Sequence, residues 1–137
     1  MAARILVIED NEANLELVRY LLEYSGYEVL AASDGVEGLA VARRERPDLI
    51  VCDLQMPRLD GFGVLAELRS LADSAEWVVV ALTAFSMPVD KRHALNAGFN
   101  GYFAKPIEPE TFVGQIEAFL LPERRAAHTS GRSDAAP

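Results

Sequence analysis

Short apolar runs alternate along the chain with longer amphipathic stretches. Arg4–Ile8 (RILVI), Leu49–Cys52 (LIVC) and Trp77–Leu82 are almost continuously apolar, without alternation between polar and apolar residues. Such runs are typical of strands that are covered on both faces. Two weaker runs, near Tyr27–Ala31 and Tyr102–Ala104, complete a set of five predicted strands.

Each predicted strand is followed by a segment whose apolar residues recur at helical spacing. Ser33 or Asp34 is expected to cap the second of these helices, because short polar side chains can bond the first free backbone N–H groups of a helix. Asp60 is expected to cap the third helix in the same way. Pro88 and Pro109 suit the first turns of the fourth and fifth helices.

Five strands alternating with five helices predict an α/β fold: a (βα)₅ doubly wound parallel sheet with five helices on two faces. The sequence has no internal repeat, and we expect one domain over residues 1–121. From Pro122 to Pro137 the chain loses its apolar periodicity. This composition predicts a disordered C-terminal tail or a linker stub.

The charge balance excludes several classes of function. The 137 residues carry 21 acidic and 13 basic side chains, for a net charge of −8. Nucleic-acid binding needs a basic footprint, so we expect no nucleic acid binding by this chain. The apolar runs are much shorter than the roughly 20 residues that span a bilayer, and no signal peptide is evident. With Cys52 as its single cysteine, the chain cannot form an internal disulfide, and we expect a cytoplasmic protein that does not bind membranes.

Polar residues that can carry chemistry stand where four of the predicted strands end. Glu9 and Asp10 follow the first strand, Asp53 the third, Thr83 the fourth and Lys105 the fifth. The carboxyl ends of parallel strands meet at one edge of a sheet, where ligands bind. Taken singly, each residue has an ordinary explanation, such as a helix cap or a turn. Their coincidence at one edge indicates a site.

Three carboxylates at one edge of a sheet repel one another, and a cation between them relieves the repulsion. Mg²⁺ is suited to this place because it takes oxygen ligands and needs only one or two carboxylates, and Mn²⁺ prefers the same ligands. A hydroxyl and an ammonium can hold the oxygens of a transferring phosphoryl group while a carboxylate attacks in line. The sequence therefore predicts metal-dependent phosphoryl transfer onto a carboxylate.

Four segments carry a resemblance to a known family. They are ILVIEDN (Ile5–Asn11), DLIVCDLQMPRLDG (Asp48–Gly61), VVALTA (Val79–Ala84) and GYFAKP (Gly101–Pro106). In this order and spacing the chain resembles the receiver domain of bacterial two-component response regulators, over residues 4 to 120. The resemblance is strongest to chemotaxis-type, stand-alone cell-cycle and hybrid-kinase receivers. It implies a flavodoxin-like fold with strand order 2-1-3-4-5.

The resemblance also implies roles for particular residues. Asp53 corresponds to the phosphorylated aspartate, and Thr83 and Lys105 to the residues that hold the phosphoryl oxygens. Tyr102 corresponds to the aromatic residue that switches position, and the peptide bond between Lys105 and Pro106 is expected to be cis. The implied Mg²⁺ ligands are Asp10, Asp53, the backbone carbonyl of Gln55 and, through a water molecule, Glu9.

These observations predict a phospho-accepting signalling module rather than an enzyme. It would take a phosphoryl group from a histidine kinase or a phosphotransfer protein onto Asp53, with only Mg²⁺-dependent self-phosphorylation and self-dephosphorylation of its own. The fourth helix, fifth strand and fifth helix would then change shape to control a downstream protein partner. We expect a monomer or a weak dimer that depends on phosphorylation.

Three alternatives stand beside this interpretation. The chain can be the receiver segment of a larger hybrid histidine kinase. An aspartate-nucleophile phosphatase is less favoured, because that class uses a second aspartate two residues after the nucleophile, where this chain has Gln55. A flavin carrier on the same fold is disfavoured because the acidic segment Glu9–Glu12 would repel the flavin phosphate.

Overall fold

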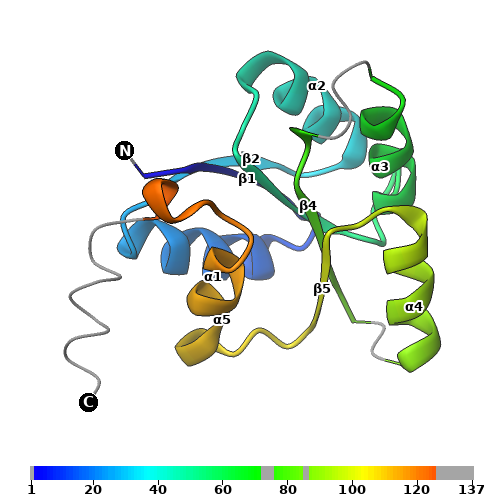
Figure 1. Ribbon diagram of the computed structural model, residues 1–137. Coiled ribbons are helices and arrows are strands. Elements are labelled where there is room, and N and C mark those ends of the chain that lie inside the picture. Colours follow the sequence, from blue (N-terminus) through cyan, green and yellow to red (C-terminus); the bar gives the residue numbers. More distant parts are fainter. Residues whose placement is uncertain (1, 72–75, 85–86, 126–137) are drawn as a thin grey trace.

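The computed structural model describes residues 2–71, 76–84 and 87–125. Within these residues five strands alternate with five helices (Figure 1). The strands are β1 (Arg4–Ile8), β2 (Glu28–Ala32), β3 (Leu49–Asp53), β4 (Val79–Thr83) and β5 (Gly101–Ala104). The helices are α1 (Glu12–Tyr24), α2 (Gly35–Glu45), α3 (Gly61–Arg69), α4 (Pro88–Ala97) and α5 (Pro109–Glu117), and the short 3₁₀ helix η2 (Pro122–Arg124) follows them.

The five strands form one parallel sheet in the order β2-β1-β3-β4-β5. This confirms the predicted (βα)₅ doubly wound fold and its strand order. β3 lies at the centre of the sheet, and all five of its residues are buried. The last residue of this central strand, Asp53, therefore lies at the middle of the carboxyl edge of the sheet.

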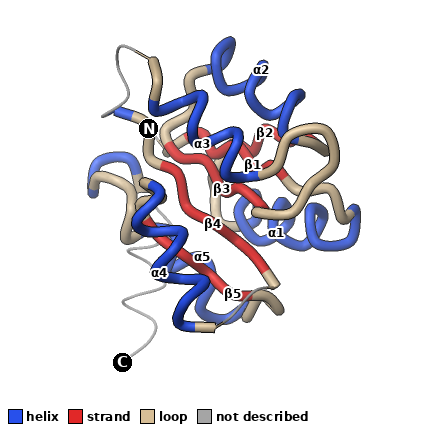
Figure 2. The backbone as a smooth tube through the Cα atoms, turned by 90° about the vertical axis from the view of Figure 1, so that its right-hand side faces the viewer, coloured by secondary structure: helices blue, strands red, loops and turns tan. Residues whose placement is uncertain are grey.

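Helices cover both faces of the sheet (Figure 2). Side chains of α2, α3 and α4 share one core cluster with alternate strand residues such as Ile8, Ile50 and Ala81. Side chains of α1 and α5 share a second cluster with the remaining strand residues, such as Val7 and Val51, which point to the other face of the sheet. Burial on both faces explains why the strands read as continuous apolar runs. Among the described residues, no helix is both long and apolar enough to cross a membrane.

Side-chain caps set where three of the helices begin. The side-chain amide oxygen of Asn11 and the carboxylates of Asp34 and Asp60 each accept a hydrogen bond of 2.8–2.9 Å. The donor is the backbone N–H three residues further along the chain. Asp60 caps α3, as predicted. Of the two residues predicted as candidates for the cap of α2, it is Asp34 that caps the helix. Pro88 and Pro109 are the first residues of α4 and α5, as their fixed φ angle favours.

Two strands begin later than the sequence predicts. β2 starts at Glu28 because the backbone N–H of Tyr27 donates to the carbonyl of Leu22 and so closes the end of α1. β4 starts at Val79, two residues after Trp77, which is buried ahead of the strand. Both shifts leave the carboxyl ends of the strands close to where they were predicted.

The structure differs from the predicted tail at its beginning. Residues 122–124 form η2, and the guanidinium of Arg124 lies 2.7 Å from the carboxylate of Asp48. The backbone N–H of Ala3 donates to the Arg124 carbonyl at 2.8 Å, and Arg125 donates to the Glu117 carbonyl at 3.0 Å. The packed part of the chain therefore extends to Arg125, while residues 126–137 lie outside the described residues.

Candidate functional site

The carboxyl ends of the strands bring the predicted polar residues to one edge of the sheet. Glu9 directly follows β1, Asp53 ends β3, Thr83 ends β4 and Lys105 directly follows β5. A hollow opens at this edge. It is lined by Glu9, Asp10, Asn11, Asn14, Asp53, Gln55, Ala84 and Lys105.

Three carboxyl groups crowd together in the hollow. Oxygen atoms of Glu9, Asp10 and Asp53 all lie within 4.8 Å of one another. Glu9 is 1% exposed and Asp53 is 6% exposed, whereas Asp10 faces solvent. Two negative charges are thus held where water screens them poorly.

Lys105 supplies the positive charge that faces the two buried carboxylates. Its Nζ lies 2.7 Å from Glu9 Oε1 and 3.2 Å from Asp53 Oδ2. Two backbone groups add hydrogen bonds: the N–H of Asn11 donates to Glu9 Oε2 at 3.0 Å, and that of Gln55 donates to Asp53 Oδ1 at 3.1 Å. One ammonium against three carboxylates leaves the cluster negative overall.

Burial raises the pKa of Glu9 to about 7, although the hydrogen bond from Lys105 acts in the opposite direction. Burial also acts to lower the pKa of Lys105, but its hydrogen bonds and its attraction to Glu9 and Asp53 outweigh this, and the pKa is raised. At neutral pH the ammonium is therefore charged, whereas burial disfavours the charged form of Glu9.

The donor set fits a divalent cation. Mg²⁺ binds oxygen ligands and usually takes one or two carboxylates together with water. Glu9, Asp10 and Asp53 offer carboxylate oxygens close together, and Gln55 lies on the rim of the same hollow. A cation here would also offset the negative charge of the crowded carboxylates.

Neither Thr83 nor Tyr102 is among the described residues that line the hollow. Thr83 is buried at the end of β4, next to Leu82, which pairs in register with Asp53. Tyr102 is half-buried on β5, and its ring packs against the core cluster beneath α2, α3 and α4. The peptide bond between Lys105 and Pro106 is cis, as the sequence predicts.

Asn14 and Ala84 also line the hollow, although no chemical role was predicted for either residue. Asn14 lies one helical turn beyond Asn11, the residue that caps α1. Its position at the start of a helix that follows β1 is the signal that could have placed it near Glu9. Ala84 follows Thr83 directly, so its place at the edge is a consequence of where β4 ends.

A doubly wound parallel sheet with clustered carboxylates and a lysine at its carboxyl edge defines a class of signalling domain. The chain matches the response regulator receiver domain family over residues 5–117, and it belongs to this family. It is thus a receiver domain of two-component signalling, a class of protein that interacts with histidine kinases and downstream targets.

Individual relatives agree with this assignment. The chain is 38% identical over 120 residues to the polar-differentiation response regulator DivK of Brucella anthropi, covering 88% of this chain and 98% of that protein. The chemotaxis response regulator CheY4 of Vibrio cholerae superposes with a TM-score of 0.82 and 31% identity, over 88% of this chain and 100% of CheY4. A third relative is the receiver domain of the sensor histidine kinase PA1611 of Pseudomonas aeruginosa, which was solved with a magnesium ion in its active site cleft. It superposes with a TM-score of 0.78 and 31% identity, over 87% of this chain and 98% of that domain.

Proposed function

We propose that Asp53 accepts a phosphoryl group from a histidine kinase or a histidine phosphotransfer protein. One observation carries the proposal: the Asp53 carboxylate is buried at the centre of the carboxyl edge, within 3.2 Å of the Lys105 ammonium and close to two further carboxylates. Among the three carboxylates, Asp53 is the one that ends the central strand. The relative PA1611, with magnesium in its cleft, supports a metal-assisted reaction.

In the proposed reaction, an oxygen of the Asp53 carboxylate attacks the phosphorus of a phosphohistidine. The new oxygen–phosphorus bond forms as the phosphorus–nitrogen bond breaks, and the imidazole leaves with the electron pair. Lys105 lies where it can offset the charge of the phosphoryl oxygens, and Thr83 is the neighbouring hydroxyl. A divalent cation held by Asp10, Asp53 and the carbonyl of Gln55, with Glu9 acting through a water molecule, would neutralise charge that builds up on the transferring group.

Phosphorylation is expected at Asp53 alone. After incubation with acetyl phosphate and Mg²⁺, intact-mass analysis should show one added phosphoryl group. Asp53→Asn should abolish the addition, and chelation of the metal should do the same to the unchanged protein. Glu12→Gln is a matched control, because Glu12 is an exposed carboxylate in the first turn of α1. A label that persists in Asp53→Asn would overturn the assignment of the acceptor.

We also propose that α4, β5 and α5 form the surface that contacts a downstream protein. A shallow depression between these elements is lined by Leu95, Tyr102, Phe103 and Phe119, and Val89 of α4 is exposed. β5 is linked directly to the end of β4, because Thr83 pairs in register with Ala104. The backbone N–H of Lys105 donates to the Thr83 carbonyl at 2.8 Å, so a movement of Thr83 can pass to β5.

Phosphorylation adds about 1.5 to 2 negative charges and strong acceptor oxygens, to which the Thr83 hydroxyl can respond. Tyr102 would move with β5, and affinity for the partner should change by about 5- to 150-fold, the usual range for such coupling. Amide hydrogen exchange with and without beryllofluoride and Mg²⁺ tests this without the partner. Exchange should change in α4 and β5 of the unchanged protein and much less in Thr83→Ala.

Lys105→Ala provides a second comparison, because it should still be phosphorylated but should transmit the change poorly. Amides of α2 serve as the internal control, since α2 packs mainly against α3, β1 and β2. Equal exchange changes in the unchanged protein and in Thr83→Ala would count against this role of the hydroxyl.

A further inference from the structure

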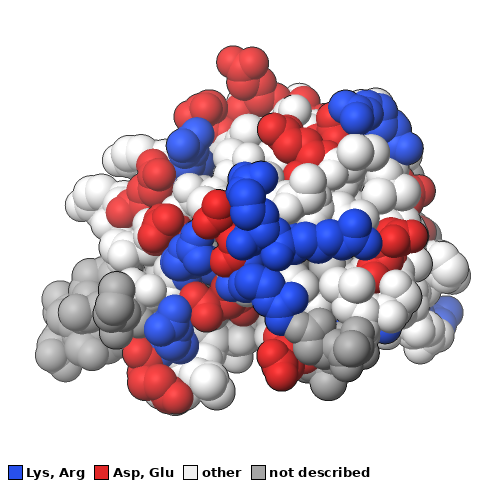
Figure 3. All heavy atoms as spheres, turned by 90° about the horizontal axis from the view of Figure 1, so that it is seen from above, with Lys and Arg blue, Asp and Glu red and all other residues white. Residues whose placement is uncertain are grey.

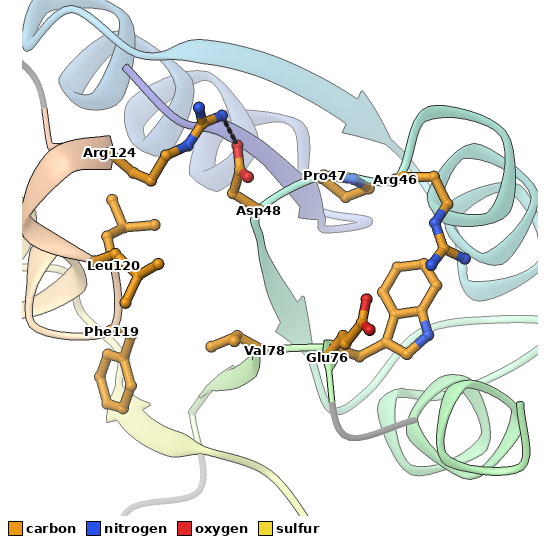
Figure 4. A pocket seen from close by; sticks show the side chains of 10 residues that line it. Arg46, Pro47, Asp48, Glu76, Val78, Phe119, Leu120 and Arg124 are labelled. Carbon is orange, nitrogen blue, oxygen red and sulfur yellow. Dashed lines mark hydrogen bonds and ion pairs between the residues drawn. The ribbon is translucent and has the colours of Figure 1, made fainter. Parts of the chain in front are cut away.

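A second hollow opens at the opposite edge of the sheet from the acidic site (Figure 4). It has a volume of about 320 Å³ and lies between the connection from α2 to β3, the segment that leads into β4, and the end of α5 with η2. Small-molecule pockets start at about 300 Å³. A five-residue strand spans roughly 16 Å, so a ligand here would be remote from Asp53. We call this hollow the amino-edge pocket; it is lined by Arg46, Pro47, Asp48, Glu76, Trp77, Val78, Phe119, Leu120, Leu121 and Arg124.

One side of the amino-edge pocket is apolar and firmly held. Val78, Phe119 and Leu120 face the hollow in Figure 4. The ring of Phe119 packs on the backbone of Gly101, where an added Cβ would come within 2.4 Å of it, and it meets Phe103 edge to face. This wall can receive the apolar part of a ligand without rearrangement.

The rim carries guanidinium groups at two opposite sides (Figure 4). The Arg46 guanidinium lies 4.7 Å from the centre of the Trp77 ring, and its backbone adopts the left-handed conformation that ends α2. Basic side chains gather in the centre of the face seen in Figure 3, with acidic ones around them. The molecule is acidic overall, but it presents cations locally.

The Arg124 side chain is held in place by Asp48 and remains 35% exposed. Its terminal nitrogen pairs with Asp48 at 2.7 Å, and the same Asp48 oxygen accepts the backbone N–H of Arg4 at 2.8 Å. The Nε of Arg124 is buried and has no hydrogen-bond partner among the described residues, so it is not open to a ligand. The rest of the guanidinium supplies positive charge at this side of the pocket.

We propose that the amino-edge pocket binds a small organic acid with an apolar body. The acid group would lie at the rim beside the accessible part of the Arg124 guanidinium, and the body would lie against Val78, Phe119 and Leu120. Asp48 is already engaged by Arg124 and Arg4, so it repels a second anion less than a free carboxylate does. Glu76 on the rim disfavours the reverse orientation, in which the acid group would lie next to it.

Trp77 makes this proposal directly measurable. It is the single tryptophan of the chain and it lines the pocket, so its fluorescence reports on occupancy. The probe is phenylacetate, and phenylacetamide is its uncharged counterpart of nearly the same shape. We expect phenylacetate to change the emission of Trp77 saturably, and phenylacetamide to bind at least fivefold more weakly.

Arg124→Gln should lower the affinity for phenylacetate at least fivefold while leaving that for phenylacetamide unchanged. Arg19→Gln on α1 removes a guanidinium away from the pocket and should change neither affinity. Because Arg124→Gln also breaks the contact with Asp48, Val78→Phe is a second variant, which fills the hollow and should abolish binding of both probes. Thermal melts establish that each variant is folded.

Three results would overturn the proposal: no saturable change in Trp77 emission, equal affinities for the two probes, or binding of phenylacetate that Arg124→Gln leaves unaltered. Binding should be the same in Asp53→Asn as in the unchanged protein, because the pocket lies at the other edge of the sheet. Failure of the pocket and failure of phosphorylation at Asp53 are therefore separate outcomes.

Discussion

Replacing Gly61 with alanine is expected to destabilise the protein by about 3 kcal/mol and to disable the acidic site without altering a carboxylate. A Cβ at Gly61 would lie 2.4 Å from the carbonyl oxygen of Asp53 and 2.9 Å from the Cα of Leu54. Both are backbone atoms and cannot turn aside. The backbone N–H of Gly61 also donates to the Leu54 carbonyl at 3.1 Å, which holds the start of α3 against the end of β3. Relief of the contact must therefore displace Asp53.

The matched control is Gly114→Ala. Gly114 lies in α5, and a Cβ there would meet nothing within 4 Å. Since alanine favours helix over glycine by up to about 1 kcal/mol, this variant should melt at the same temperature as the unchanged protein or slightly higher. Thermal melts and acetyl phosphate labelling measure both effects. If Gly61→Ala melts and labels like the unchanged protein, the connection between β3 and α3 can shift without disturbing Asp53.

The elements of the fold could be predicted because burial on both faces leaves a strong local signal. Leu49–Cys52 is apolar throughout since β3 is covered by helices on each side, and Asp60 and Pro109 mark helix starts through chemistry that acts within a few residues. The order of the strands has no such local signal. It came from the resemblance to receiver domains, because pairing between β1 and β3 depends on contacts across more than forty residues.

The site followed from topology, whereas its internal contacts did not. That Glu9, Asp53 and Lys105 meet is a consequence of parallel strands ending at one edge. Lys105 lies closer to Glu9 than to Asp53. This difference depends on side-chain positions, which the order of residues does not determine. The docking of η2 was missed for a related reason: Arg124 is held by a polar contact with Asp48, 76 residues away, and such contacts leave no apolar periodicity.

The largest remaining effect concerns the stability of the metal-free protein. The pKa of Glu9 is raised from its ordinary value of 4.5 to about 7, chiefly by burial. Between these two values the folded state binds a proton that the unfolded state has lost, so the free energy of unfolding falls as pH rises. This loss of unfolding free energy is complete once the pH exceeds the pKa of Glu9 in the folded state. The charged form of Glu9, held in a buried site, therefore destabilises the metal-free protein most at neutral and alkaline pH.

We expect the melting temperature in chelator to fall as pH is raised from 4.5 to 8, and this slope to be much smaller in Glu9→Gln. At pH 8, Mg²⁺ should raise the melting temperature of the unchanged protein, because it binds the folded state preferentially. At ten times its dissociation constant the gain is about 1.4 kcal/mol, or roughly 5 °C for a domain of this size. Melts across a series of Mg²⁺ concentrations measure both effects.

Asp10→Asn and Asp53→Asn separate charge repulsion from general damage to the fold. Each removes one of three negative charges whose oxygens lie within 4.8 Å, while amide and carboxylate have nearly the same shape. In chelator at pH 8 both variants should melt higher than the unchanged protein, by an amount on the order of 1 kcal/mol in unfolding free energy once Lys105 and solvent offset part of the repulsion. Both should also lose most of the response to Mg²⁺, since each removes an oxygen ligand. Variants that melt lower than the unchanged protein in chelator would show that the carboxylates stabilise the fold, and the physical case for a cation among them would fail.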